Sequence, residues 1–324
     1  MPPLRYLTAA DVEAAIPPVD VRIGLAERAM RALGTEAELP PKIGVHPRPE
    51  ASFAHAMPAH LRDARGMHDL LGVKWIAGFP TNSGLGLRGL YGMLLLNDPA
   101  TGVPTAVVDA GPLTAHRTAS VSGLAIREYA PRRSGPLRVG LVGAGVQAHS
   151  HLPVIAHLLP GAALAVFTRR TEQAEEVAQA ARAQGLGPVR LASSPEDAVN
   201  GADVVLTVAS FGPVRQVMPP EWLTPDALVV PVDYATYVSA AVARDADLFL
   251  VDERGQFEAN RAAGLFDDYP DPHATIGEAL ERGLARPAGR VVVTHLGVGL
   301  ADLVFADAIL DAAAAAGIGT ILPR

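Results

Sequence analysis

Apolar runs of about five residues alternate with longer segments of helical periodicity through the second half of the chain. A continuous apolar run of that length is typical of a strand buried on both faces, and strands that alternate with helices form βαβ units around a parallel sheet. The pattern predicts an α/β fold with a doubly wound, Rossmann-type parallel sheet. We expect its strands at residues 137–142, 163–167, 203–208, 227–232, 247–251 and 290–294, and its helices at 146–159, 171–184, 238–243 and 274–282.

The first half of the chain has a different order, with helices first and a series of strands after them. Thr8, with Asp11 three residues later, and Asp20 are placed to cap the first two helices. These runs predict a second sheet, formed before the nucleotide domain begins. Its strands are expected at 43–46, 53–57, 71–79, 90–97 and 104–109, with a polar loop at 80–86, a turn at 98–102 and helices at 8–15, 21–33 and 114–129.

A segment rich in Pro, Arg, Ser and Gly at 131–136 is the clearest linker. A last apolar helix is predicted over 300–316, after the final strand of the nucleotide domain, and we expect it to return to the first domain. The predicted division is therefore a discontinuous α+β domain of residues 1–125 and 299–324, and a Rossmann domain of residues 126–298.

The apolar run that ends at Val142 leads into a G-x-G-x-x-A motif and then a helical pattern. Strand, glycine turn and helix in this order are the context in which the motif indicates dinucleotide binding. Gly143 permits the tight turn, Gly145 lets the backbone approach a pyrophosphate, and the helix N-terminus receives the negative charge. The candidate cofactor-binding residues of the motif are Gly143, Ala144, Gly145, Val146, Gln147 and Ala148.

The residues after the second nucleotide-domain strand bear on the choice of cofactor. An NAD enzyme usually carries Asp or Glu there to bind the ribose hydroxyls. This chain has Thr168, Arg169 and Arg170 instead. A hydroxyl and two guanidinium groups suit a 2′-phosphate, so NADP(H) is favoured, and NAD(H) stays possible. The alternative is a solvated helix start with arginines that bind nothing.

Composition narrows the function classes. The chain has 324 residues, a formal net charge of −7 and no cysteine. The negative charge argues against nucleic-acid and anionic-membrane surfaces, and the lack of cysteine excludes disulfides, thiolate metal sites and cysteine nucleophiles. No signal peptide or membrane-spanning run is found, so we expect a cytoplasmic protein. His149 and His151 lie two apart, unlike the i, i+4 pair of a metal helix, so no metal site is predicted.

Lysine is rare in this chain: of 27 basic residues, only Lys42 and Lys74 are lysines. Either they occupy positions where arginine cannot replace lysine, or they are present by chance in an arginine-rich composition. Arg117 is predicted in the first turn of a helix, where the dipole disfavours a cation unless an anion is bound nearby. Its alternative is a surface ion pair. Asp233 directly follows an apolar strand, where an acid can exchange protons, or can simply cap a turn.

Together these residues resemble the ornithine cyclodeaminase/mu-crystallin family, which includes alanine dehydrogenases, ketimine and iminosuccinate reductases and lysine cyclodeaminases. The matching residues are Pro41-Lys42, Ala56-Met57-Pro58-Ala59, Gly72-Val73-Lys74, Asn97-Asp98-Pro99, Thr101-Gly102, Thr114 to Ala119, Gly143 to Ala148, Val232-Asp233, Val251-Asp252, Leu296-Gly297 and Asp302. No single motif decides the resemblance, but the ordered set covers nearly the whole chain.

The resemblance implies a substrate-binding domain that dimerises through its sheet, and it implies roles. Lys42, Lys74 and Arg117 match positions that hold a substrate carboxylate, with Lys74 also counted as catalytic, and Asp233 matches the catalytic acid/base. His55 and Met57 are implied in substrate binding. Besides the residues of the glycine motif and 168–170, cofactor contacts are implied for Thr118, Thr207, Val208, Ala209, Val232, His295 and Gly297.

Hydride transfer between nicotinamide and the α-carbon of an amino or imino acid is the activity that we expect, in a homodimer acting on a small amino, imino or keto acid. A cyclodeaminase and a non-catalytic, crystallin-like NADPH-binding protein are the alternatives. His55 replaces the acid that ornithine cyclodeaminases carry two residues before their Met-Pro, and Tyr234 to Tyr237 lacks the family's usual Pro-Gly-Lys. Both departures count against ornithine as substrate.

Overall fold

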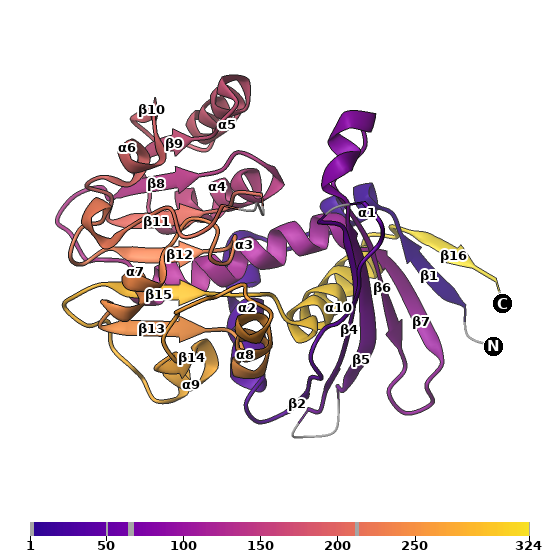
Figure 1. Ribbon diagram of the computed structural model, residues 1–324. Coiled ribbons are helices and arrows are strands. Elements are labelled where there is room, and N and C mark those ends of the chain that lie inside the picture. The colour runs from indigo at the N-terminus through magenta and orange to yellow at the C-terminus, as the bar shows by residue number, and fades with distance from the viewer. Residues whose placement is uncertain (1–2, 50, 64–67, 211–213, 324) are drawn as a thin grey trace. The chain divides into compact units, whose positions relative to one another are not determined.

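The computed structural model describes residues 3–49, 51–63, 68–210 and 214–323. The chain divides into two compact units, Met1–Arg117 with Gly297–Arg324 (unit 1) and Thr118–Leu296 (unit 2). The division lies inside helix α3 (Ala110–Tyr129), before the predicted boundary at 125, and also before the predicted linker at 131–136. Figure 1 labels the elements of both units, which are described here one at a time.

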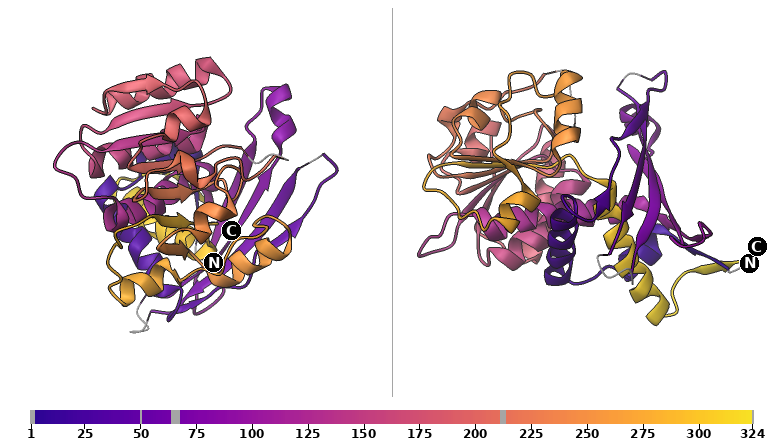
Figure 2. Two further views of the ribbon diagram at one scale, coloured as in Figure 1. Left: turned by 60° about the vertical axis from the view of Figure 1, so that its left-hand side comes forward. Right: turned by 90° about the horizontal axis from the view of Figure 1, so that it is seen from below.

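Unit 2 is built on a parallel sheet whose strands occur in the order β10-β9-β8-β11-β12-β15-β13-β14. Every pairing in it is parallel, as the alternation of strands and helices predicted, and helices cover both faces (Figure 2). The strands are β8 (Arg138–Val142), β9 (Ala163–Phe167), β10 (Val189–Leu191), β11 (Val204–Thr207), β12 (Leu228–Pro231), β13 (Leu248–Val251), β14 (Ala274–Thr275) and β15 (Val291–Thr294). The helices are α4 (Val146–Leu158), α5 (Thr171–Ala183), α6 (Pro195–Val199), α7 (Ala240–Arg244), α8 (Arg254–Ala262), α9 (Ile276–Glu281) and the 3-10 helix η2 (Pro220–Trp222).

Unit 1 is a mostly antiparallel sheet in the order β16-β1-β7-β6-β5-β4-β2, with β3 also paired to β4. Among the described strands of this unit, only β1 and β7 pair in parallel. The strands are β1 (Leu4–Leu7), β2 (Ala37–Glu38), β3 (Ile43–Val45), β4 (Phe53–Leu61), β5 (Leu70–Gly78), β6 (Leu90–Asn97), β7 (Pro104–Asp109) and β16 (Thr320–Leu322), and the helices are α1 (Ala9–Ala14), α2 (Val19–Ala32), α10 (Gly299–Ala315) and the 3-10 helix η1 (Pro80–Leu85).

Helix α10 returns to unit 1, as the sequence predicted, and packs on β4 and β5. Two glycines make this contact close. A Cβ atom on Gly72 would lie 2.8 Å from the Leu303 side chain, and one on Gly299 would lie 2.7 Å from the carbonyl oxygen of Met57. Such distances are below van der Waals contact, so both positions have to be free of a side chain. The first turn of α10 thereby lies directly against the central strands.

The predicted starts of helices α2 and α3 were wrong. Helix α2 begins at Val19 with Pro18 as its N-cap, so Asp20 lies inside its first turn and does not cap it. Helix α3 begins four residues earlier than predicted, because Asp109 at the end of β7 accepts a hydrogen bond from the N–H of Gly111 (2.8 Å). Arg117 therefore lies in the second turn of α3, and the helix-dipole argument for it does not apply.

Two other departures concern the segments around Met57 and Pro80. Strand β4 continues past Met57 to Leu61, through Pro58. On the side of β4 that faces β3 and β2, Pro58 lies between the residues that pair with β3 and those that pair with β2, so its missing N–H interrupts neither of these two pairings. The predicted polar loop at 80–86 contains the 3-10 helix η1. The described helices include none that is long and apolar enough to cross a membrane.

Candidate functional site

Five neighbouring strands of unit 2 end at one edge of its sheet. In open α/β sheets, ligands bind beyond the carboxyl ends of the strands, at the point where successive connections turn to opposite sides. That point lies beside β8, because the chain continues to β9 on one side and comes back to β11 on the other. In the order β9-β8-β11-β12-β15, the first residues after each strand are Thr168, Gly143, Val208, Val232 and His295, all predicted cofactor residues.

The glycine turn is held by main-chain contacts on both sides. The N–H of Gly143 donates to Phe167 O at the end of β9 (2.8 Å), and the N–H of Val208 donates to Val142 O (2.8 Å). Gly143 has φ +118°, and a Cβ atom there would lie 2.7 Å from the carbonyl oxygen of Val208. Only glycine meets both requirements.

Gly145 differs from Gly143 in what surrounds it. It is the N-cap of α4, makes no side-chain cap, and a Cβ atom added to it would meet nothing within 4 Å. The start of α4 thus has no side-chain cap and no side chain at its N-cap residue, which suits a phosphate group. Ala148, one turn further along the helix, is fully buried where α4 packs on the sheet.

Beyond β9 the structure presents basic side chains. Thr168 is half-buried, and Arg169 and Arg170 are exposed at the start of α5, where Arg170 is the N-cap. Gly143 and Thr168 are close, because the Gly143 N–H binds the carbonyl of the residue before Thr168. Among the described residues, neither arginine forms an ion pair with an acid, so the two guanidinium groups can bind an anion beside the turn.

Asp233 is almost fully buried one residue beyond the edge position of β12. Its carboxylate accepts hydrogen bonds from Thr207 Oγ1 (2.7 Å) and from the N–H of Ala209 (3.1 Å). Burial raises its pKa to about 7, although these hydrogen bonds act in the opposite direction. An acid with such a pKa is populated in both protonation states near neutral pH and can give or take a proton there.

A buried polar chain supports His295. Its Nε2 lies 2.8 Å from Ser122 Oγ on α3, and that hydroxyl lies 2.8 Å from His151 Nε2 on α4. His151 Nδ1 donates to the Gln147 carbonyl (2.6 Å), and burial lowers the His151 pKa to about 4. A neutral His151 then accepts the Ser122 proton, so Ser122 accepts a hydrogen bond from His295 Nε2. Sequence reasoning missed Ser122 and gave His151 no role.

Unit 1 holds the second group of predicted site residues around a buried carboxylate. Lys74 Nζ lies 2.6 Å from Asp302 Oδ2, and Arg117 Nε lies 3.0 Å from Asp302 Oδ1. All three side chains are less than 8% exposed. Burial is the largest effect on Lys74 and lowers its pKa to about 7, although the Asp302 charge acts against this shift. Two cations that share one anion leave a net positive charge for a further anion.

The wall beside Lys74 is formed by β4 and the segment before β3. Met57 is paired with Lys74 in register and is buried. His55 stacks on Phe53 with ring centroids 4.5 Å apart, and a Cβ atom on Gly44 would come within 3.2 Å of its ring. Burial is the largest cause and the charge of Lys42 the second largest, and together they lower the pKa of His55 to about 4. His55 is therefore a neutral, oriented ring at physiological pH.

The predicted site residues thus separate into the two units. Lys42, His55, Met57, Lys74, Arg117 and Gly297 belong to unit 1, and Thr118, Thr207, Val208, Ala209, Val232, Asp233, His295, the glycine motif and residues 168–170 belong to unit 2. Sequence reasoning gave Asp302 no role. Its signal was an acid within the apolar run from Val298 to Ala306, where an unpaired charge is costly. The described residues contain no group of three or more His, Cys, Asp or Glu side chains placed to hold a metal.

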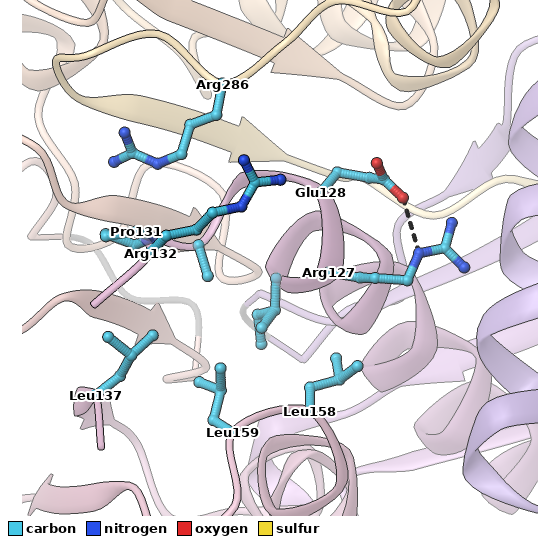
Figure 3. A pocket seen from close by; sticks show the side chains of 10 residues that line it. Arg127, Glu128, Pro131, Arg132, Leu137, Leu158, Leu159 and Arg286 are labelled. Atoms are coloured by element: carbon cyan, nitrogen blue, oxygen red, sulfur yellow. Dashed lines mark hydrogen bonds and ion pairs between the residues drawn. The ribbon is translucent and has the colours of Figure 1, made fainter. Parts of the chain in front are cut away.

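A pocket of about 230 Å³ lies elsewhere in unit 2, at the C-terminal ends of α3 and α4. Leu137, Leu158 and Leu159 line one side and charged side chains the other (Figure 3). Arg286 donates to the carbonyls of Tyr129 (2.9 Å) and Pro287 (2.6 Å), so this guanidinium caps main-chain groups at the end of α3. No predicted site residue lines the pocket.

Comparison with known proteins shows which family the chain belongs to. The model of the ornithine cyclodeaminase/mu-crystallin family matches residues 6–315. The chain belongs to this family. It is 32% identical to the nodulation efficiency protein NfeD of Rhizobium meliloti, over 99% of this chain and 98% of that protein. It is 30% identical to the ketimine reductase mu-crystallin of Mus musculus, over 80% of each.

A solved structure of an archaeal alanine dehydrogenase dimer with bound NAD superimposes with a TM-score of 0.84, at 25% identity and 99% coverage of both chains. The Rossmann-type fold of this member of the ornithine cyclodeaminase/mu-crystallin family is thereby confirmed.

The contrast between Gly143 and Gly145 gives a stability test of the cofactor turn. Gly143→Ala should lower the free energy of unfolding by about 2 kcal/mol or more, because the positive φ and the contact with Val208 both oppose a side chain. Gly145→Ala, with open space around it, should cost about 1 kcal/mol at most. Urea denaturation followed by circular dichroism measures both. Equal losses in the two variants would show that the close contact does not constrain residue 143.

Proposed function

We propose that this chain is a nicotinamide-dependent oxidoreductase that moves a hydride between nicotinamide and the α-carbon of an amino acid or its imine. It works as an imine reductase or amino acid dehydrogenase. The observation that carries the proposal is the link between the glycine turn and the acid. Val208 contacts Gly143, and the next residue, Ala209, donates its N–H to Asp233. A group that exchanges protons at neutral pH thus belongs to the same edge as the dinucleotide turn.

The cofactor residues fit a dinucleotide on physical grounds. The start of α4 offers N–H groups with no side-chain cap, and the end of β9 offers Thr168 and Arg169. A bound nicotinamide cofactor supplies the hydride for reduction, or accepts it for oxidation. The protein has to hold the α-carbon of the substrate at the nicotinamide, keep the substrate out of unproductive positions, and supply or accept the proton.

The substrate carboxylate is bound by Lys74 and Arg117, with Lys42 beside them, and His55 and Met57 contact the rest of the substrate. When the C=N bond of an imine is reduced, the α-carbon takes the hydride and the nitrogen takes a proton. Asp233 gives that proton and regains one from water. In the oxidative direction the same carboxylate accepts the proton from the amine. The relatives named as ketimine reductase and alanine dehydrogenase support this reaction class.

The two alternatives have less support. A cyclodeaminase for ornithine has to grip a distal ammonium group, and His55 is neutral at physiological pH and carries no negative charge. A protein that only stores or binds NADPH has no need for an acid with its pKa near 7 or for a buried pair of cations. We therefore expect no formation of proline from ornithine.

Turnover by the purified chain tests the proposal. Small 2-keto acids with ammonia or methylamine, and preformed cyclic imines, should oxidise NADPH. The Asp233→Asn variant should lose activity by a factor of about 10² to 10⁴, with the cofactor affinity little changed, because it keeps the shape and loses the titrating proton. Asp226→Asn, a surface aspartate of the same unit, is the control. Release of proline and ammonia from ornithine, or no turnover of any imine, would contradict the proposal.

We further propose that NADP(H) is the preferred cofactor, with NAD(H) as the alternative that the archaeal relative uses. Arg169→Ala should weaken NADPH binding by about 10-fold to 100-fold, the scale of a charge-assisted contact, and leave NADH binding nearly unchanged. Arg182→Ala, at the far end of α5, is the matched control. Dissociation constants from the fluorescence of the reduced cofactor measure the effect, and equal affinities for NADPH and NADH in the unmutated protein would overturn the preference.

The homodimer is also a proposal. One face of the unit 1 sheet exposes large apolar side chains: Ile43, Val45, Trp75, Tyr91 and Met93 are each 41% to 64% exposed. Trp75 and Met93 are direct cross-strand partners, so these side chains share one face. An apolar sheet face of this kind is typical of an interface, and the archaeal relative is a dimer.

Met93→Glu should therefore shift the protein from dimer to monomer at micromolar concentration, because a carboxylate would be buried in the interface. Val21→Glu, at an equally exposed apolar position on α2, should leave the dimer intact. Sedimentation velocity distinguishes the two species. A Met93→Glu protein that sediments as the unmutated protein does would place the interface elsewhere.

A further inference from the structure

The buried carboxylate of Asp302 has no part in the reaction proposed above, yet both carboxylate-binding cations contact it. It lies in the first turn of α10, is fully buried, and joins Lys74 on β5 to Arg117 on α3. Removing two cations from water is costly, and a shared anion offsets part of that cost. Asp302 is therefore the group that allows two cations to be held at this position before any substrate arrives.

The atoms that Asp302 contacts decide which atoms remain for a ligand. Arg117 uses Nε toward Asp302. The outer nitrogens of the guanidinium lie over Gly297, where a Cβ atom would come within 2.7 Å of Nη1 and 2.8 Å of Nη2. Gly297 has φ +80° and carries no side chain to displace them. The planar fork of an arginine binds a carboxylate through its outer nitrogens, so Asp302 orients that fork by holding its inner one.

Charge gives Asp302 a second effect. The groups that face Lys74 are Asp302 from α10, Arg117 from α3, and Lys42 from the segment before β3, with His55 from β4 neutral. Asp302 is the only negative charge in this set, and it favours the ammonium form of Lys74 against burial and two cations. Without it, the pKa of Lys74 would fall further, and the neutral amine would bind a carboxylate poorly.

We propose that Asp302 is a positioning residue that keeps Lys74 protonated and holds the Arg117 fork for one substrate carboxylate. The inference rests on the proposed function for the identity of the ligand, but not for the ion triad itself. The triad of Lys74, Arg117 and Asp302 carries a single net positive charge, which matches one carboxylate.

The chain offers an uncommonly direct measurement, because it contains only two lysines. Protein grown with lysine labelled at Cε and Nζ gives two side-chain NMR signals, and Lys42→Arg assigns the remaining one to Lys74. The Lys74 signal should titrate near pH 7 in the unmutated protein and at lower pH in Asp302→Asn. Asp307→Asn, on the same helix and paired with the exposed His68, should leave the titration unchanged. An unaltered Lys74 titration in Asp302→Asn would overturn the proposal.

Kinetics with the imine substrate found above give the second measurement. At pH 6.5, where Lys74 of the unmutated protein is mostly protonated, Asp302→Asn should raise KM by about 10-fold to 100-fold and leave the NADPH dissociation constant unchanged. Lowering the pH to 6 should bring the KM of Asp302→Asn part of the way back to the value of the unmutated protein, because Lys74 regains its proton. A merely structural defect would not respond to pH in this way. A raised KM that stays the same at pH 6 would contradict the role of charge.

A wild-type experiment keeps the proposal testable if Asp302→Asn does not fold. Pyrrole-2-carboxylate, a planar carboxylate with no reducible imine, should raise the pH at which the Lys74 signal titrates, because it adds a second anion to the triad. Binding without any change in that titration would overturn the role of the triad in holding carboxylates. If the enzyme reduces no imine but Lys74 still depends on Asp302, the proposed function fails and the triad stands.

Discussion

The close approach of Gly143 to the end of β11 is the contact on which the arrangement of the strand ends in unit 2 depends. The Val208 carbonyl occupies the space that a side chain at residue 143 would need. The main chain of the turn after β8 therefore lies directly against the main chain of the loop after β11. Ala209 then presents its N–H to Asp233, so the position of the acid follows from the position of the cofactor turn. One missing side chain thus aligns three strand ends.

Burial shifts the two central ionisable groups in opposite directions toward the same value. It raises the pKa of Asp233 and lowers that of Lys74, each to about 7, because a low-dielectric interior disfavours the charged form of acids and bases alike. The surrounding groups limit both shifts: hydrogen bonds from Thr207 and Ala209 favour the Asp233 carboxylate, and Asp302 favours the Lys74 ammonium. Asp233 can then change protonation at neutral pH, as the acid–base role proposed for it requires.

The N-terminal strands show how far local sequence reasoning reaches. The turn from Asp98 to Gly102 could be predicted from the sequence, because it depends on a local interaction. The Asp98 side chain accepts a hydrogen bond from the N–H of Thr101 (2.8 Å), three residues away. The start of α3 was not, because Asp109 ends a strand and caps the helix at once. Helices α6 and α8 were missed as well. Helix α6 has only five residues despite Ser194 as its cap, and α8 follows Glu253, an uncommon N-cap.

The sequence alone was enough to predict the parallel sheet and the cofactor turn and to single out the two rare lysines. These features depend on hydrophobic periodicity, on glycine stereochemistry and on composition. The order of apolar runs also indicated that the last helix returns to the first domain. Only the tertiary structure decided what Asp302 contacts, since its partners Lys74 and Arg117 lie about 230 and 185 residues away along the chain. The same holds for the chain from Gln147 through His151 and Ser122 to His295. Charge and hydrogen bonding depend on distance in space and on burial, and neither can be read from separation along a chain.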